Sequence, residues 1–216
     1  MLEAAAVAAV LACACGNVAR AGIIPNPGGV ATVVGGGTAS ITGPFTLAPN
    51  NNPSTTSSNF ASIQKTFTSP TTPIDIVFNV NNSQGVTEYL LAEGPFNLSG
   101  IAWNGYHIQL GFGTGASFTL ANPSFGLQFD PTPAPSSTDF PTVVLTPQKL
   151  DFSNGHVATG SGASLAFTID VPDVPGAATY QFTMREFPNL VPEPSAFLMA
   201  GFGIAGFMTR RWLRSR

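Results

Sequence analysis

The 216 residues are enough for one domain of ordinary size. Charged residues make up only 9% of the chain, against about 25% in soluble globular proteins, whereas glycine and proline number 23 and 19. This composition excludes a charged disordered chain and argues against a helical bundle. With 17 phenylalanines among turn-forming residues, it favours an all-β fold of many short strands.

Charge is distributed unevenly along the chain. Five of the eight basic residues lie before residue 22 or after residue 190, so the segment between keeps three basic and nine acidic side chains, a net charge of −6. Three scattered cations cannot neutralise a run of phosphates. The charge pattern therefore argues against a nucleic-acid partner.

Residues 1–21 are typical of a signal peptide. An apolar run covers residues 4–15, and Ala19 and Ala21 supply the small side chains that signal peptidase requires, so we expect cleavage after Ala21. The first three residues contain no Lys or Arg, which a misassigned start codon would explain. The alternative is a buried alanine-rich helix, but the glycines and prolines of 22–29 end that pattern at once.

Both cysteines, Cys13 and Cys15, lie inside this segment. Cleavage after Ala21 would leave no cysteine, and therefore no disulfide, thiol nucleophile or cysteine-bound metal. A second interpretation takes residues 10–13 as a lipoprotein-like box with Cys13 acylated, although Leu11 stands where such boxes prefer a smaller residue.

The C-terminal segment, residues 191–216, has three parts in a fixed order. The box Val191, Pro192, Glu193 and Pro194 is followed by 13 apolar residues, 196–208, and then by a basic tail containing Arg210, Arg211, Arg214 and Arg216. As a single helix the apolar part would span about 20 Å, short of the bilayer's roughly 30 Å of hydrocarbon. We therefore expect a marginal inner-membrane anchor with the arginines on the cytoplasmic side.

This order of box, short apolar helix and arginine cluster resembles the PEP-CTERM sorting signal of Gram-negative bacteria. Two prolines around Glu193 deny the backbone both helix and ladder hydrogen bonds, which leaves an extended segment accessible to a protease. The alternative is an ordinary C-terminal anchor with a chance Pro-Glu-Pro sequence.

The resemblance implies a processing route. In this family the Pro-Glu-Pro box is recognised by exosortase, a membrane protease-transpeptidase. The proteins are exported, held briefly by the helix, and then released or transferred to the cell surface. Many of the bacteria make exopolysaccharide, which suggests a link to exopolysaccharide or biofilm.

Residues 22–190 are expected to form the body. Period-2 alternation of apolar residues predicts half-buried antiparallel strands at 74–80, 106–112, 165–171 and 180–185. Weaker candidates are 38–47, 60–67, 86–91, 116–120, 125–129 and 142–150. Turn signals between them predict a β-sandwich of eight or more strands, with jelly-roll or immunoglobulin-like connectivity. The polar stretches 48–59 and 130–139 are expected to be exposed loops.

No residues in the sequence form a recognisable catalytic constellation, and no cofactor is indicated. His107 and His156 are predicted to be exposed and unpaired, without metal-ligand spacing or a carboxylate pair nearby. The glycine-rich segments 111–115 and 160–162 precede no helix that could bind a phosphate. We therefore expect the protein not to be an enzyme.

Two weaker binding features remain. Asp170 and Asp173 flank a strand end and form a weak candidate for a surface Ca²⁺ site, with a solvated loop as the default. Trp103 and Tyr106 could stack on sugar rings if exposed, although Trp in a sandwich usually lies in the core. The leading hypothesis is a noncatalytic surface or matrix protein; the alternatives are a carbohydrate-binding module and a secreted hydrolase with a dispersed carboxylate pair.

Overall fold

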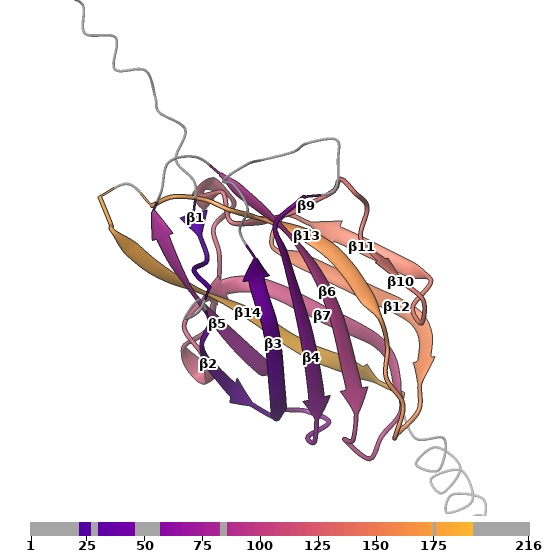
Figure 1. Ribbon diagram of the computed structural model, residues 1–216. Coiled ribbons are helices and arrows are strands. Elements are labelled where there is room, and N and C mark those ends of the chain that lie inside the picture. Colours follow the sequence, from indigo (N-terminus) through magenta and orange to yellow (C-terminus); the bar gives the residue numbers. More distant parts are fainter. Residues whose placement is uncertain (1–21, 27–29, 46–56, 83–85, 175, 192–216) are drawn as a thin grey trace, which may run out of the picture.

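The computed structural model describes residues 22–26, 30–45, 57–82, 86–174 and 176–191. They form two curved β-sheets that face each other, as Figure 1 shows, so the predicted all-β sandwich is confirmed. The signal peptide predicted at 1–21, the Pro-Glu-Pro box and the predicted C-terminal helix lie outside the described residues. Within the described ranges, no helix is long and apolar enough to cross a membrane.

The larger sheet has eight strands in the order β1-β5-β14-β7-β12-β11, with β2 pairing to β5 and β8 pairing to β7. All of its pairs are antiparallel. Its strands are β1 (Gly22–Ile23), β2 (Val30–Gly35), β5 (Ile74–Asn82), β7 (Trp103–Phe112), β8 (Thr119–Leu120), β11 (Thr142–Thr146), β12 (Lys149–Val157) and β14 (Thr179–Leu190).

The smaller sheet has six strands in the order β10-β13-β6-β4-β3, with β9 also pairing to β13. Its strands are β3 (Gly37–Phe45), β4 (Phe60–Phe67), β6 (Thr87–Asn97), β9 (Gln128–Asp130), β10 (Ser136–Ser137) and β13 (Leu165–Val171). Two 3-10 helices, η1 (Gly115–Ser117) and η2 (Pro123–Phe125), lie between β7 and β9. One pair, β4 with β6, is parallel. A parallel pair needs a crossover, and here β5 in the facing sheet provides it.

The chain passes from one sheet to the other through a run of three glycines. Gly35 pairs with Ile74 in the larger sheet, and Gly37 pairs with Phe67 in the smaller sheet. Gly35 has a φ of 122°, and a Cβ on Gly37 would lie 1.9 Å from the carbonyl oxygen of Thr66. Only glycine fits such a turn, because any side chain would collide with the adjoining backbone.

The apolar residues of the predicted strands point between the sheets. Leu165, Phe167, Ile169 and Val171 are all buried, as the alternation in 165–171 predicts. The same holds for the other strongly predicted strands, whose buried residues include Ile74, Ile76, Phe78, Val80, Ile108, Leu110, Phe182 and Met184. They join one core cluster, so hydrophobic burial between the sheets is what positions the strands.

Several weaker expectations need correction. The 116–120 stretch contains η1 and only the two-residue β8. Of the loop expected at 48–59, residues 48–56 lie outside the described part. Ser57 and Asn59 are buried, and their side chains donate to the Glu88 carbonyl oxygen at 2.7 and 3.0 Å. The loop expected at 130–139 begins with the last residue of β9 and includes β10, because both strands pair with β13.

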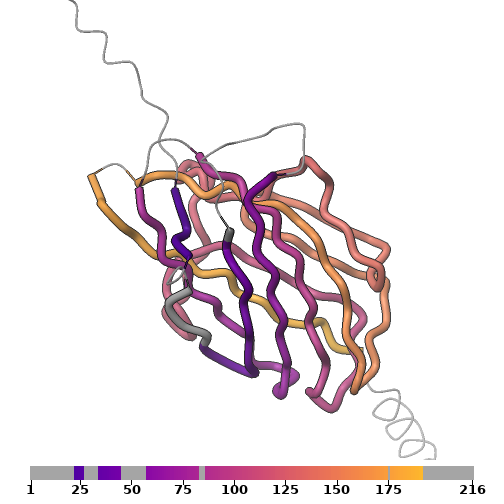
Figure 2. The backbone as a smooth tube through the Cα atoms, viewed as in Figure 1, coloured from indigo at the N-terminus to yellow at the C-terminus, as the bar shows by residue number. Residues whose placement is uncertain are grey.

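The two ends of the described chain leave the body at opposite ends. Gly22 pairs with Asn82, and Thr179 at the start of β14 pairs with the adjacent Asn81. β14 then runs along the larger sheet between β5 and β7, and its last residue, Leu190, pairs with Trp103. Figure 2 shows this path, with the indigo β1 near one end and the yellow end of β14 leaving at the other.

Phe67→Ala tests the packing between the sheets. The buried Phe67 ring of the smaller sheet lies edge-on to Trp103 and Tyr106 of the larger sheet, with centroid distances of 5.4 and 5.8 Å. Its truncation should lower the free energy of unfolding by about 3–5 kcal/mol. The matched control is Phe96→Ala at a residue 38% exposed, which should cost far less. Urea titration measures the free energy of unfolding of both variants, and equal decreases for Phe67→Ala and Phe96→Ala would contradict this packing.

Candidate functional sites

Four polar side chains meet in the middle of the apolar core. Lys65 of β4 and Glu93 of β6 come from the smaller sheet, whereas Tyr106 of β7 and Glu186 of β14 come from the larger one. Lys65 Nζ lies 2.5 Å from Glu93 Oε2 and also contacts Glu186 Oε2. The Tyr106 hydroxyl donates to the same Glu186 oxygen at 2.7 Å. We call this set the core network; it connects the sheets through the contact between Lys65 and Glu186.

Burial sets the protonation of the core network. The side chains of Lys65, Glu93 and Glu186 are 0% exposed. Loss of solvation raises the pKa of Glu93 well above its usual value, and the neighbouring Glu186 carboxylate raises it further, although Lys65 acts in the opposite direction. Burial and the two carboxylates also raise the pKa of Tyr106. The raised pKa of Glu93 favours its neutral form beside the contact between Lys65 and Glu186.

The sequence analysis missed the core network, although its members follow the strand alternation. Lys65 stands in register with the inward Ile63 and Phe67, and Glu186 follows the inward Phe182 and Met184. A charged residue at an inward position of an amphipathic strand is the signal that could have found it. Because the side chains of Lys65, Glu93 and Glu186 are 0% exposed, the core network is structural in this conformation.

His107 has a partner that the sequence did not predict. Its Nδ1 contacts the Asp151 carboxylate, because the two residues face each other across β7 and β12. The Phe187 ring of β14 packs beside the imidazole at 5.0 Å. The expectation of an unpaired His107 was therefore wrong, whereas His156 is exposed as predicted. Among the hydrogen bonds of the described residues, none joins His107 to a serine or threonine hydroxyl.

A second ion pair anchors η1 to the larger sheet. Arg185 donates to both Asp75 carboxylate oxygens, each at 2.7 Å, and its guanidinium stacks on the Phe118 ring at 4.1 Å. The backbone of Gly115 joins both side chains: its N–H donates to Asp75 and its carbonyl accepts from Arg185. Nε and Nη2 of Arg185 and both carboxylate oxygens of Asp75 are bonded within the protein, so this pair also serves the fold.

Three acidic side chains gather on the smaller sheet. One carboxylate oxygen each of Glu88, Asp130 and Asp170 lies within 4.8 Å of the others. Their residues are 0%, 7% and 3% exposed. Gln128 donates to Asp170 Oδ2 at 3.0 Å and the Thr132 N–H donates to Asp130 Oδ1 at 2.6 Å. We call these three residues the carboxylate cluster; its oxygens are of the kind that hard cations prefer.

The cluster differs from the predicted Asp170–Asp173 pair. Asp170 is a member, but Glu88 and Asp130 join it rather than Asp173. Burial raises the pKa of Asp170; the Gln128 hydrogen bond opposes this effect and the Asp130 charge adds to it. No local pattern in the sequence could have shown this grouping, because it depends on three strands lying side by side.

The aromatic residues considered for sugar stacking are not on the surface. Trp103 and Tyr106 are both 0% exposed and lie in the core. Trp103 donates its indole N–H to Ser99 at 3.1 Å, and Tyr106 belongs to the core network. These two rings therefore offer no platform for a carbohydrate.

The sorting residues lie at the end of the described chain. Val191 follows β14, and its N–H donates to the Ala102 carbonyl oxygen at 2.9 Å. The rest of the box, the basic tail and the cleavage residues Ala19 and Ala21 lie outside the described part.

The comparisons with known proteins concern this C-terminal region. Residues 190–211 match the PEP-CTERM protein-sorting motif. The chain therefore carries a PEP-CTERM sorting signal, as its box, apolar segment and arginines predict. The motif directs a protein to export through the membrane-associated exosortase, which is the processing partner. No curated protein matches the chain, and no solved structure matches it.

Lys65→Met tests the core network. Removing the ammonium leaves the Glu186 carboxylate without a counter-charge in the core, so we expect a loss of about 3–5 kcal/mol in the free energy of unfolding. Lys149→Met, the same change at an exposed position of β12, should stay within about 0.5 kcal/mol of the parent. Chemical denaturation measures both variants. Equal small effects would show that the buried ammonium contributes nothing.

Glu93→Gln tests the raised pKa of Glu93. Above the ordinary glutamate pKa of 4.5 the unfolded chain releases this proton, whereas the folded chain retains it up to its raised pKa. The folded state therefore binds more protons in this window, and its stability must fall as the pH rises. Glutamine removes this contribution, so the parent should lose stability relative to the variant as pH increases. The free energy of unfolding of parent and variant is measured by urea titration at each pH. Plots of this free energy against pH that run parallel for the two proteins would contradict a raised pKa of Glu93.

Proposed function

We propose that the protein is an exported, noncatalytic component of the cell surface or extracellular matrix, delivered through its PEP-CTERM signal. The observation that supports this proposal best is the sorting motif at residues 190–211. In this proposal signal peptidase cuts after Ala21, the inner membrane holds the C-terminal segment briefly, and exosortase then processes it. The final location is the surface or matrix of a Gram-negative bacterium, in contact with exopolysaccharide or biofilm.

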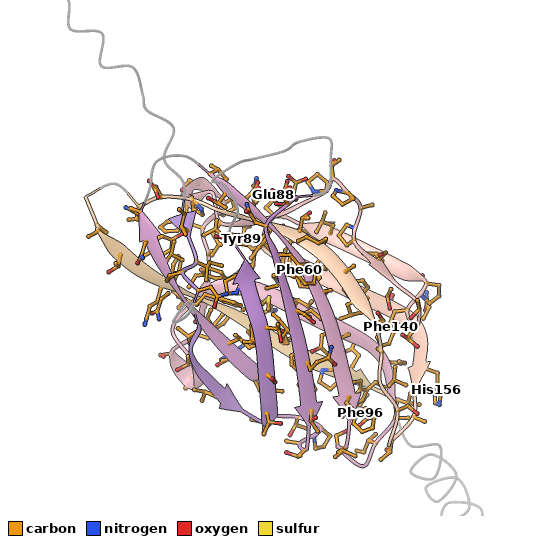
Figure 3. The ribbon with its side chains drawn as sticks, viewed as in Figure 1. Phe60, Glu88, Tyr89, Phe96, Phe140 and His156 are labelled. Atoms are coloured by element: carbon orange, nitrogen blue, oxygen red, sulfur yellow. The ribbon has the colours of Figure 1, made fainter. Side chains whose placement is uncertain are left out.

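The position of the motif suits this route. β14 stays hydrogen-bonded until Leu190, and Val191 is still fixed to Ala102. The body thus continues to the first residue of the box without a linker, so its end beside the β6–β7 connection would face the membrane during processing. Phe96, 38% exposed, lies on β6 at this end (Figure 3). Leu98, 50% exposed, comes just after the last residue of β6. Apolar side chains are compatible with a membrane interface.

Two alternatives have less support. A carbohydrate-binding module would need an exposed aromatic platform, but Trp103 and Tyr106 are in the core. A secreted hydrolase would need an accessible acid–base pair, and the Glu93–Glu186 pair is buried. The partly exposed His107–Asp151 pair has no hydroxyl nucleophile hydrogen-bonded to it among the described residues. A glycan array and an activity screen on the exported protein would detect either alternative.

Glu193→Ala tests the sorting proposal. The substitution deletes the only charge of the box while leaving the apolar segment and the tail intact. In a host with the matching exosortase, the variant should accumulate as uncut precursor in the inner membrane, whereas the parent reaches the surface fraction. Cell fractionation with detection of the β-sandwich body measures the difference.

The basic tail provides the control. Arg210→Lys, Arg211→Lys and Arg214→Lys together keep the positive charge, so this variant should be sorted like the parent. The corresponding change to glutamate should weaken anchoring without altering the box. If the Glu193 variant reaches the surface as efficiently as the parent, the segment is an ordinary anchor and the proposal fails.

A further inference from the structure

The carboxylate cluster is assembled by three neighbouring strands. β13 lies between β6 and β9, and Asp170 stands directly opposite Glu88 across the β13–β6 ladder. Asp130 pairs with Thr168, two residues before Asp170 and on the same face of β13. The intervening Ile169 points into the core, so the three carboxylates share the face that is turned away from the core. Figure 3 shows Glu88 at the end of the sheet where β9 and β13 meet β6.

The carboxylate cluster lies on the outer face of the smaller sheet, yet its three side chains are buried. Because water is excluded there, keeping the three carboxylates ionised costs free energy. Three carboxylates within a few ångströms repel one another strongly when water is excluded. The ion pairs of the described residues include neither Asp130 nor Asp170. One oxygen stands out: Asp170 Oδ1 is buried and has no hydrogen-bond partner within the described part of the chain, while Oδ2 is held by Gln128. A buried acceptor of this kind requires a partner.

We propose that Glu88, Asp130 and Asp170 form a Ca²⁺-binding site. Ca²⁺ binds carboxylate oxygens at about 2.3–2.6 Å, so two ligands on opposite sides of one ion lie up to about 5 Å apart. The cluster oxygens all lie within 4.8 Å of one another, which is inside this span. Mg²⁺ demands a more regular octahedron and gives up its water ligands reluctantly, so a cluster of three carboxylates suits Ca²⁺ better. Asp170 Oδ1 supplies the ligand atom whose hydrogen-bonding capacity is otherwise unused.

The site would act as a clamp on the smaller sheet. β9 has only three residues, and its pairing with β13 is correspondingly short. An ion shared by β6, β13 and β9 would fix this short strand to the sheet and remove the repulsion among the three acids. Extracellular modules bind Ca²⁺ with dissociation constants of about 10⁻⁴–10⁻³ M, so the site would bind its ion once the protein is outside the cell.

Thermal unfolding of the full-length chain after treatment with EGTA tests the site. Ca²⁺ at about 100 times its dissociation constant should raise the midpoint by roughly 5–10 °C, and calorimetry should give one ion per chain. Mg²⁺ at the same concentration should give a smaller shift. Asp170→Asn keeps the shape of the side chain but removes its charge, so it should abolish most of the Ca²⁺ response.

Asp173→Asn is the matched control, since Asp173 lies three residues away and outside the cluster; it should keep the full Ca²⁺ response. Asp130→Asn is a second variant and should lose the response like Asp170→Asn. If the variants fail to fold, the shift of the parent chain's unfolding midpoint with Ca²⁺ tests the proposal by itself. A parent midpoint that does not change with Ca²⁺, or an Asp170→Asn variant that retains the shift, would overturn the proposal. None of these results depends on sorting, so the proposed function can fail without affecting them.

Discussion

The Lys65 ammonium in the middle of the core is the constraint on which the arrangement of the sheets depends. Apolar faces alone could pack in several relative positions, because hydrophobic contact is non-directional. The contact of Lys65 with Glu186 joins β4 of the smaller sheet to β14 of the larger one, whereas Glu93 and Tyr106 hold the two partners from within their own sheets. The raised pKa of Glu93 favours its neutral form, which lessens the repulsion between the two buried carboxyl groups. We attribute the choice of one packing to the Lys65–Glu186 contact.

This arrangement separates the functional regions of the molecule. The carboxylate cluster lies where β6 begins, and the chain leaves β14 beside the connection that follows β6. Glu88 and Asn97 are nine residue steps apart in β6, which places these two regions about 30 Å apart along the strand. Exosortase processing at one end of the body would therefore leave the proposed Ca²⁺ site at the other end undisturbed.

The sequence predicted those features that follow from local patterns. The alternation of apolar and polar residues predicted β13 with its actual bounds, because apolar side chains stand at every second position: Leu165, Phe167, Ile169 and Val171. The Pro-Glu-Pro box could be recognised because its residues are contiguous in the sequence. Long-range features were not predicted. Lys65, Glu93 and Glu186 stood at inward positions, but their meeting depends on how the sheets face each other. The carboxylate cluster depends on the register of β6, β9 and β13, and its member Asp130 stood at the start of a stretch that resembled an exposed loop.

The intact mass of the native protein recovered from the cell surface tests the central claim most directly. If the chain is exported and sorted by exosortase, the recovered protein should begin at Gly22, contain the β-sandwich body, and lack the apolar segment and the arginine tail. A surface protein that still ends at Arg216, or one that stays in the cytoplasm with its first residues attached, would contradict this account.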